Sequence, residues 1–255
     1  MKVITVTNQK GGTGKTSTAL FLTYGLAHRG KKVLLIDLDQ QADASFSMHV
    51  DYDQNKTTFE VLTGDAALKD IIVKVNDNID LAPASSKLAE LDVVLTQKVR
   101  IDPQYILKDT IKNSKVNYDY IVIDTPPALS EAVLNALTAS NTVLVPTQAD
   151  IYSLKGLGEL AQTIAAIKNR SNPDLEIAGI LIGRFNKRTV FAKSISKVLE
   201  SAAEQLHTKV FKSRIREATA VKESQNAFES IYEYDPRGKV TEDVNNFIDE
   251  FLQGN

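Results

Sequence analysis

Short apolar runs alternate along the chain with polar-patterned segments of helical length. The runs are rich in β-branched residues and cover residues 2–7, 32–37, 120–124, 141–146 and 175–182. Runs that are apolar at nearly every position are typical of strands in the centre of a parallel sheet, where crossover helices cover both faces. The pattern therefore predicts an α/β fold with a doubly wound, mainly parallel sheet and helices on both faces.

The segments between these runs predict the helices. The first begins at Lys15 and ends at His28, just before Gly30, a residue that commonly terminates a helix. The helices are expected at residues 15–28, 129–139, 153–170, 189–206 and 242–252. Residues 51–100 are less regular, and only a short strand pair around 71–75 and 79–81 is predicted there. No repeat or flexible linker interrupts the chain, which predicts a single domain over residues 1–255.

Composition narrows the class of protein. The chain has 255 residues, of which 43% are hydrophobic and 24% charged, as in an ordinary globular domain. It has no cysteine, which excludes disulfides, thiolate zinc sites, iron–sulfur clusters and cysteine nucleophiles and fits a reducing cytoplasm. The longest uncharged stretch, residues 132–149, is broken by polar residues and a proline, and it does not predict a membrane span. The first residues lack the apolar core of a signal peptide, so a cytoplasmic protein is expected.

The segment after the first apolar run reads NQKGGTGKTSTAL. Glycines surround a turn, and Lys15-Thr16-Ser17 opens a helix, which is the context of a phosphate loop. Glycines let backbone N–H groups point at an anion, and the helix dipole adds positive potential. Lys15 is expected to pair with the β- and γ-phosphates, and the Thr16 hydroxyl to ligate Mg²⁺. A glycine-rich turn without a ligand is the weaker interpretation, because the strand, the turn and the helix all agree.

Two further apolar runs end in carboxylates. Asp37 and Asp39 close the second run, two residues apart and therefore on the same side of an extended chain. Asp124 closes the third, in the Walker B pattern of a buried strand that delivers a carboxylate toward Mg²⁺, and Thr125-Pro126-Pro127 follows as a candidate switch that senses the γ-phosphate. Because the carboxyl ends of parallel strands face the ligand crevice, these side chains are expected near the phosphate loop. Solubilising carboxylates at strand ends are the alternative interpretation, and the four apolar residues before Asp37 disfavour it.

The run KGGTGKTS resembles the deviant Walker A phosphate loop of the ParA/MinD group of P-loop ATPases. Gln9 stands where the usual pattern has its first glycine, and Lys10 stands at the loop entrance. The resemblance implies that Lys10 reaches across a nucleotide-sandwich homodimer to the ATP of the other subunit and takes part in catalysis. By itself Lys10 is equally compatible with a solvated loop cation. The residues that the resemblance assigns to the nucleotide are Lys10, Gly11, Gly12, Thr13, Gly14, Lys15, Thr16 and Ser17.

The carboxylates acquire roles from the same resemblance. The stretch DLDQQ is similar to the D-x-D-P-Q element of the group, with Gln40 where proline is common. The resemblance implies that Asp39 orients the attacking water in catalysis beside Lys10 and Lys15. It also implies that Asp37 assists Thr16 and Asp124 at the metal. An ordinary aspartate is a poor base at neutral pH, which favours orientation of the water over proton abstraction.

The likeness extends over nearly the whole chain, through residues 145–164, 179–189 and 234–251. No helix-turn-helix segment precedes the phosphate loop in this sequence, so the chain resembles the small ParA form. That form implies nonspecific DNA binding, association with the nucleoid and a separate centromere-binding, ParB-like adaptor. The expected cofactors are ATP and Mg²⁺.

Positive charge is concentrated late in the chain. The net charge is -2, whereas residues 184–222 hold ten Lys/Arg against three Glu, a net +7. The resemblance implies that Arg188 contacts DNA, but a second arginine of the family falls on Ala220, and nearby cations are expected to compensate. Lys193 and Lys197 share one side of the predicted helix, as a row of phosphates would favour. The expected DNA-binding side chains are Arg188, Lys193, Lys197, Arg214, Arg216 and Lys222. A solvated helix face that balances acidic surface elsewhere is the alternative.

Together these features predict a Mg²⁺-dependent ATPase that partitions plasmid or chromosomal DNA. ATP closes the dimer, the dimer binds DNA, and the adaptor stimulates hydrolysis and release. The alternative is a MinD-like positioning ATPase on a membrane surface or a protein cargo. A membrane role needs a basic amphipathic helix at the C-terminus, but residues 239–255 carry four carboxylates against Lys239, so no membrane partner is expected.

Overall fold

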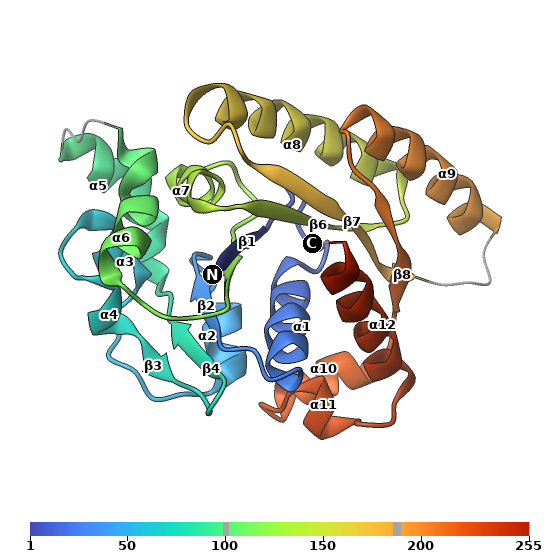
Figure 1. Cartoon of the computed structure of the whole chain (residues 1–255), viewed down its shortest axis with the longest axis horizontal. Helices are drawn as coiled ribbons and strands as arrows, with labels where there is room; N and C mark the ends of the chain where they lie inside the picture. The colour runs from blue at the N-terminus through green and yellow to red at the C-terminus, as the bar shows by residue number, and fades with distance from the viewer. Residues whose placement is uncertain (99–101, 186–189, 255) are drawn as a thin grey trace.

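The apolar runs form the strands of one eight-stranded sheet in the computed structural model, which describes residues 1–98, 102–185 and 190–254, without the side chains of 151–152 and 190–196 (Figure 1). The strand order is β3-β4-β2-β5-β1-β6-β7-β8, and every neighbouring pair is parallel except β3 and β4. The strands are β1 (Lys2–Val6), β2 (Val33–Asp37), β3 (Val73–Lys74), β4 (Ile79–Ala82), β5 (Tyr120–Asp124), β6 (Thr142–Gln148), β7 (Glu176–Phe185) and β8 (Val210–Arg216). The predicted doubly wound, mainly parallel sheet is confirmed.

Helices cover both faces of this sheet. One face carries α1 (Lys15–His28), α2 (Asp43–Met48), α10 (Thr219–Asn226), α11 (Ile231–Tyr234) and α12 (Lys239–Gln253), which share one apolar core. The other carries α3 (Thr58–Thr63), α4 (Leu68–Ile71), α5 (Leu91–Gln97), α6 (Ile106–Ser114), α7 (Glu131–Ala139), α8 (Ile151–Arg170) and α9 (Val190–Gln205), with two 3₁₀ turns, η1 (Ser86–Glu90) and η2 (Pro103–Tyr105). Within the described part of the chain, no helix is long and apolar enough to cross a bilayer.

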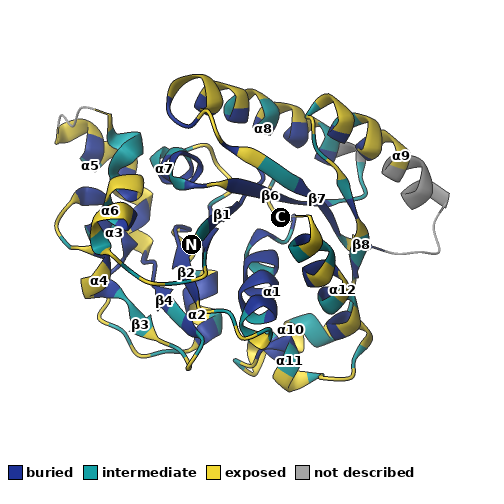
Figure 2. Cartoon of the chain, viewed as in Figure 1, coloured by how far each residue is buried: buried dark blue, intermediate teal, exposed yellow. Residues whose placement is uncertain are grey.

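The strand side chains alternate between the two cores. In β1, Ile4 and Val6 pack against the α1 and α12 side, while Val3 packs on the opposite face. In β2, Leu35 packs on the α1 side and its neighbour Leu34 packs on the opposite face. Both faces are buried, as the dark central strands in Figure 2 show, and this explains why the runs are apolar at nearly every position.

The register of the central strands places three loops at one edge of the sheet. Val6 at the end of β1 lies beside Asp124 at the end of β5, and Asp124 lies beside Asp37 at the end of β2. The segments that follow these three strands therefore begin at the same level. This edge is where parallel sheets bind ligands.

The structure adds elements that the pattern did not reveal. Strand β8 lies inside the basic segment, three short helices, α3 to α5, lie within the irregular region 51–100, and α6 follows it. The strand pair predicted there is confirmed as the antiparallel β3 and β4, though β3 has only two residues. The last helix begins at Lys239 rather than at Glu242. Strand β8 was missed because it is an edge strand with alternating polar residues, which read as a charge cluster.

Candidate functional site

The segment between β1 and α1 forms a tight loop that ends at a helix N-terminus. Gly12 and Gly14 have φ angles of +75° and +85°, in the left-handed region that favours glycine. Gly14 is the N-cap of α1, and no acidic side chain lies in the first turn. The Gln148 side chain donates to the Gly12 carbonyl oxygen at 2.6 Å and fixes the loop against β6. The first N–H groups of α1 and the loop amides are therefore arranged to bind an anion.

Lys15 lies buried under this loop. Its side chain is 7% exposed, and Nζ donates to the Lys10 carbonyl oxygen at 3.3 Å. Burial lowers the pKa of Lys15, while the negative charges of Asp124 and Asp39 act in the opposite direction. A partly desolvated ammonium group beside carboxylates is well placed to exchange its weak carbonyl contact for a phosphate oxygen.

Asp37 organises the segment that carries Asp39. One Asp37 oxygen accepts from the Asp39 backbone N–H at 3.0 Å, and the other accepts from the Ser45 N–H at 2.9 Å and the Ser45 hydroxyl at 2.7 Å. Burial raises the pKa of Asp37 to about 6, although the Ser45 and Asp39 donors lower it. Asp39 itself is 8% exposed, and its Oδ1 accepts from the Gln41 N–H at 3.0 Å. Asp37 thus holds Asp39 in place at the sheet edge.

The Asp124 carboxyl is buried at the end of β5 with an incomplete set of hydrogen bonds among the described residues. It is fully buried; Oδ1 accepts from the Thr125 N–H at 3.1 Å, and Oδ2 has no hydrogen-bond partner among the described residues. Burial raises its pKa well above the usual range, and the charge of Asp37 adds to this, while the Thr16 hydroxyl and Lys15 act in the opposite direction. An unsatisfied buried carboxylate oxygen is suited to a cation.

The residues at this edge fit Mg²⁺. The described residues contain no cluster of three or more His, Cys, Asp or Glu side chains suited to a metal. Mg²⁺ commonly does without one, because it retains waters and takes one or two protein oxygens together with substrate phosphates. The Asp124 carboxylate and the Thr16 hydroxyl, at the start of α1, are the oxygens of that type here.

Lys10 forms an ion pair within its own chain. Its Nζ donates to both Asp150 oxygens at 2.7 and 2.6 Å, and to the Ser153 hydroxyl at 3.4 Å. Asp150 is also the N-cap of α8, where it accepts from the Ser153 N–H. The Lys10 side chain is 25% exposed and is held by Asp150 of its own chain. Sequence reasoning did not connect Asp150 with the loop, because the two residues lie 140 positions apart.

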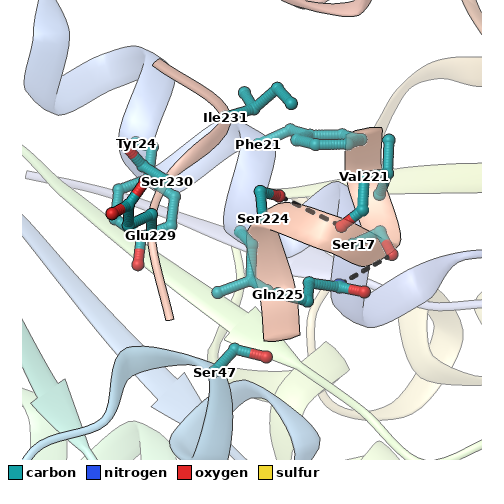
Figure 3. Close-up of a pocket in the computed structure, with 11 residues that line it drawn as sticks. Ser17, Phe21, Tyr24, Ser47, Val221, Ser224, Gln225, Glu229, Ser230 and Ile231 are labelled. Atoms are coloured by element: carbon teal, nitrogen blue, oxygen red, sulfur yellow. Dashed lines mark hydrogen bonds between the residues drawn. The ribbon is translucent and has the colours of Figure 1, made fainter. Parts of the chain in front are cut away.

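A cavity of about 160 Å³ opens beside the loop. It lies between the start of α1, the ends of β7 and β8, and α10, and it has apolar walls from Phe21, Ile215, Ala218 and Val221. A smaller cavity of about 20 Å³ is lined by α10, α1, Ser47 of α2 and the segment that leads into α11 (Figure 3). There the Gln225 amide donates to the Ser17 hydroxyl at 3.4 Å, which connects α10 to the first turn of α1.

The expected DNA-binding residues are distributed over several elements. Lys197 is exposed on α9, and Lys222 lies at the rim of the 160 Å³ cavity. The Arg214 guanidinium lies 4.4 Å from the centre of the Phe185 ring, and Arg216 forms an ion pair with Asp243 of α12. Arg188 and the side chain of Lys193 lie outside the described residues.

Comparison with known proteins places this site in a family. A family model described as an AAA domain matches residues 1–177. The sporulation initiation inhibitor protein Soj of Bacillus subtilis strain 168 is 36% identical over 243 residues, which cover 94% of each chain.

Solved structures extend the likeness to three dimensions. A cobyrinic acid a,c-diamide synthase from Mycobacterium smegmatis, solved with an ATP analogue and magnesium, is 28% identical with a TM-score of 0.78 and covers 94% of this chain and 98% of its own. A chain described as a plasmid partition protein from Borrelia burgdorferi B31, bound to AMPPNP, is 26% identical with a TM-score of 0.81 and covers 99% of this chain and 98% of its own. The chromosome partitioning protein ParA of Caulobacter vibrioides strain NA1000 / CB15N is 36% identical over 201 residues, which cover 77% of this chain and 74% of its own. The family model and these relatives show that the chain belongs to the ParA/MinD family of partitioning ATPases.

Proposed function

We propose that this protein is an ATPase that partitions plasmid or chromosomal DNA. The observation that carries the proposal is the buried, unsatisfied Asp124 oxygen beside Lys15 and the phosphate loop, at the sheet edge where Asp39 also lies. These residues supply an anion site, a metal oxygen and a carboxylate for water in one place. The solved neighbour described as a plasmid partition protein, and the neighbours solved with adenine nucleotides, support the same conclusion.

The phosphates and the nucleoside of the nucleotide bind at two adjoining places. The loop amides from Gly11 to Gly14, with the Lys15 ammonium, bind the phosphates, as the positive φ angles and the helix N-terminus favour. The nucleoside occupies the 160 Å³ cavity next to Ser17, where apolar side chains such as Val221 cover a base. Lys222 and Arg184 also line this cavity, so Lys222 contacts the nucleotide.

Asp124 and Thr16 would hold Mg²⁺, which would neutralise charge on the phosphates. Asp37 keeps the neighbouring segment in place through its bonds to Ser45 and Asp39. Burial raises the pKa of the Asp124 carboxyl, and a cation held beside it would act in the opposite direction by favouring the ionised form.

Hydrolysis requires the attacking water to be oriented and the charge on the phosphates to be compensated. Asp39 is the carboxylate available for the water, since its backbone is fixed by Asp37 and one of its oxygens by Gln41. Lys10 compensates charge on the nucleotide of a second subunit after it leaves Asp150. A cation supplied in trans in this way makes hydrolysis dependent on dimerisation, as an arginine finger does.

The DNA step uses cations that each subunit carries outside the catalytic site. Lys197 is exposed on α9, and the segment from residue 184 to 222 has a net charge of +7. Two copies in a dimer double the cations presented to one duplex, which makes nonspecific binding steeply dependent on ATP. A ParB-like adaptor that stimulates hydrolysis then releases the DNA.

The test is a set of three variants measured for nucleotide binding, dimerisation and hydrolysis. Lys15→Ala is expected to abolish nucleotide-dependent behaviour. Lys10→Ala is expected to bind ATP but to lose hydrolysis that depends on the dimer. Asp39→Ala is expected to remain an ATP-bound dimer on DNA, with turnover slower by roughly a hundredfold to ten-thousandfold.

Two results would contradict the proposal. Normal adaptor-stimulated turnover in Lys10→Ala would exclude the role in trans. DNA binding of equal strength with ATP, with ADP and without nucleotide would exclude the switch, even if the protein hydrolyses ATP.

A further inference from the structure

Helix α8 contacts three consecutive residues at the entrance of the phosphate loop. Asn8 is buried between β6 and α8, and a Cβ added at Gly156 of α8 would lie 3.3 Å from its Oδ1. Lys10 reaches Asp150 at the N-cap. Between them, the Gln9 side-chain Nε2 donates to the Thr163 hydroxyl at 2.8 Å. The loop entrance is therefore attached to α8 at more than one point.

The Gln9–Thr163 hydrogen bond is directional. The Thr163 hydroxyl donates to the Glu159 carbonyl oxygen of its own helix at 3.2 Å, so its lone pairs remain for Gln9. Both side chains are half-buried, which protects the contact from full competition by water. Thr163 therefore acts as an acceptor that α8 holds in a fixed position.

The proposed role of Lys10 requires its ion pair with Asp150 to break, but it does not require the Gln9 hydrogen bond to break. The Lys10–Asp150 ion pair must break before Lys10 can approach another chain, whereas the Gln9 contact uses neither the Lys10 side chain nor the loop amides. The two attachment points on α8 lie about 20 Å apart along the helix. The Gln9 hydrogen bond can therefore persist after the Lys10 ion pair has broken.

We propose that the Gln9–Thr163 hydrogen bond positions the loop entrance and so directs Lys10 toward the second subunit once it has left Asp150. Gln9 and Thr163 are positioning residues in this arrangement, and the inference rests on the proposed role of Lys10 in trans. The departure from the usual loop pattern then has a physical reason. A glycine at position 9 has no side chain and could not make this contact.

The test uses one disruptive variant, one conservative variant and one matched control. Thr163→Val keeps the shape of the side chain and removes the acceptor, whereas Thr163→Ser keeps the hydroxyl. Thr96→Val is the control, because the Thr96 hydroxyl makes the same intrahelical bond, to the Asp92 carbonyl oxygen at 2.8 Å, on the exposed surface of α5.

The first measurement is hydrogen exchange of residues 7–15 in the nucleotide-free protein. We expect exchange to be faster in Thr163→Val, by about threefold or more, because the loop opens locally when the Gln9 hydrogen bond is removed. Thr163→Ser and Thr96→Val should match the wild type. Unchanged exchange in Thr163→Val would overturn the proposal without any reference to ATP.

The second measurement separates nucleotide affinity from dimerisation. With a non-hydrolysable ATP analogue, Thr163→Val should bind within about twofold of the wild type but dimerise about tenfold more weakly, since only the orientation of Lys10 is impaired. Thr163→Ser should restore dimerisation, and thermal unfolding should shift more in Thr163→Val than in Thr96→Val, because only Thr163→Val also loses the Gln9 hydrogen bond. Equal losses of affinity and dimerisation, or no rescue by serine, would reject the positioning role. If the wild type binds no nucleotide, the proposed function fails, and the exchange measurement still decides the Gln9 contact.

Discussion

The buried carboxyl group of Asp124 lowers the stability of the folded protein, although it is suited to bind a cation. It is fully buried, one oxygen has no hydrogen-bond partner among the described residues, and burial raises its pKa. A carboxyl with a raised pKa destabilises the folded state as pH increases, because the unfolded chain ionises freely and the folded chain does not. The buried Asp124 carboxyl therefore lowers the stability of the nucleotide-free protein as the pH rises, and the proposed metal would offset this effect.

Asp124→Asn should accordingly stabilise the nucleotide-free protein. We expect a gain on the order of 1–3 kcal/mol at pH 8, because asparagine carries no charge for burial to oppose, and little gain near pH 4, close to the pKa of the unfolded carboxyl. Urea unfolding at the two pH values measures this. With Mg²⁺ and ATP the order should reverse, since only the wild type gains the metal. A variant that is less stable at pH 8 without nucleotide would contradict this account.

The Lys10–Asp150 ion pair must break before Lys10 can act on a second subunit, so weakening it should favour the dimer. Asp150→Asn should keep the cap of α8, because asparagine caps helices as well as aspartate does. It should weaken the contact with Lys10, whose side chain is 25% exposed, so that the dimer forms at an ATP concentration lower by up to about fivefold. Analytical ultracentrifugation across an ATP titration measures the effect. Asp150→Ala, which also loses the cap, is the comparison for damage to α8.

Individual site residues could be predicted from sequence when a local motif identifies them. The loop from Lys10 to Ser17 and the strand-end residues Asp37 and Asp124 stand next to signals that can be read along the chain. Asp150 and Thr163 could not be found, because their contacts join residues 140 and 154 positions apart. Their own surroundings indicate only an ordinary helix.

Carboxylates of helix α12 accept hydrogen bonds from the backbone of the edge strand β8. Strand β8 is at the edge of the sheet, and α12 covers it. Glu250 accepts from the backbone N–H groups of Lys212 and Ser213 at 2.8 Å, and Asp243 accepts from that of Arg216 at 3.0 Å. The carboxylates of one helix thus satisfy donors that an edge strand would otherwise expose to other chains.

Glu250→Gln should therefore loosen this edge. Burial works against the charged form, but the Lys212 and Ser213 donors lower the pKa of Glu250 below its usual 4.5. Its contribution is present above that pH and is lost as the pH falls through the lower folded value. We expect a loss of about 1 kcal/mol at pH 7 that shrinks between pH 4.5 and 3. Urea unfolding measures it, with Glu204→Gln on α9 as the control.

Elements were predictable where both faces of a strand are buried. All five apolar runs became strands, and Lys15–His28 became α1 with the predicted ends. The elements that the pattern missed are short helices, such as α4 with four residues, and the edge strand β8. Short or half-exposed elements bury too few side chains to leave a periodic signal, and their tertiary contacts decide their structure.

The proposed function requires the whole molecule to bind DNA strongly only when two copies are joined. Removing Arg188 and Lys193 together should weaken binding equally for all sequences and reduce the slope of log affinity against log salt by about one for each phosphate that a subunit no longer neutralises. ATP binding and dimerisation should not change. Arg216→Ala is the contrasting variant, because Asp243 already neutralises that guanidinium. It should affect stability more than the salt slope, and equal slopes for all variants would place the DNA elsewhere.

The register of β1 also has a consequence for biosynthesis. This strand begins at Lys2, yet its partners on either side are β5, which starts at Tyr120, and β6, which starts at Thr142. The phosphate loop is attached to Gln148 at the end of β6 and to Thr163 on α8. A ribosome therefore exposes the loop long before the partners that shape it exist. Such distant pairings are slow to form, so nucleotide binding can begin only after more than half of the chain has emerged.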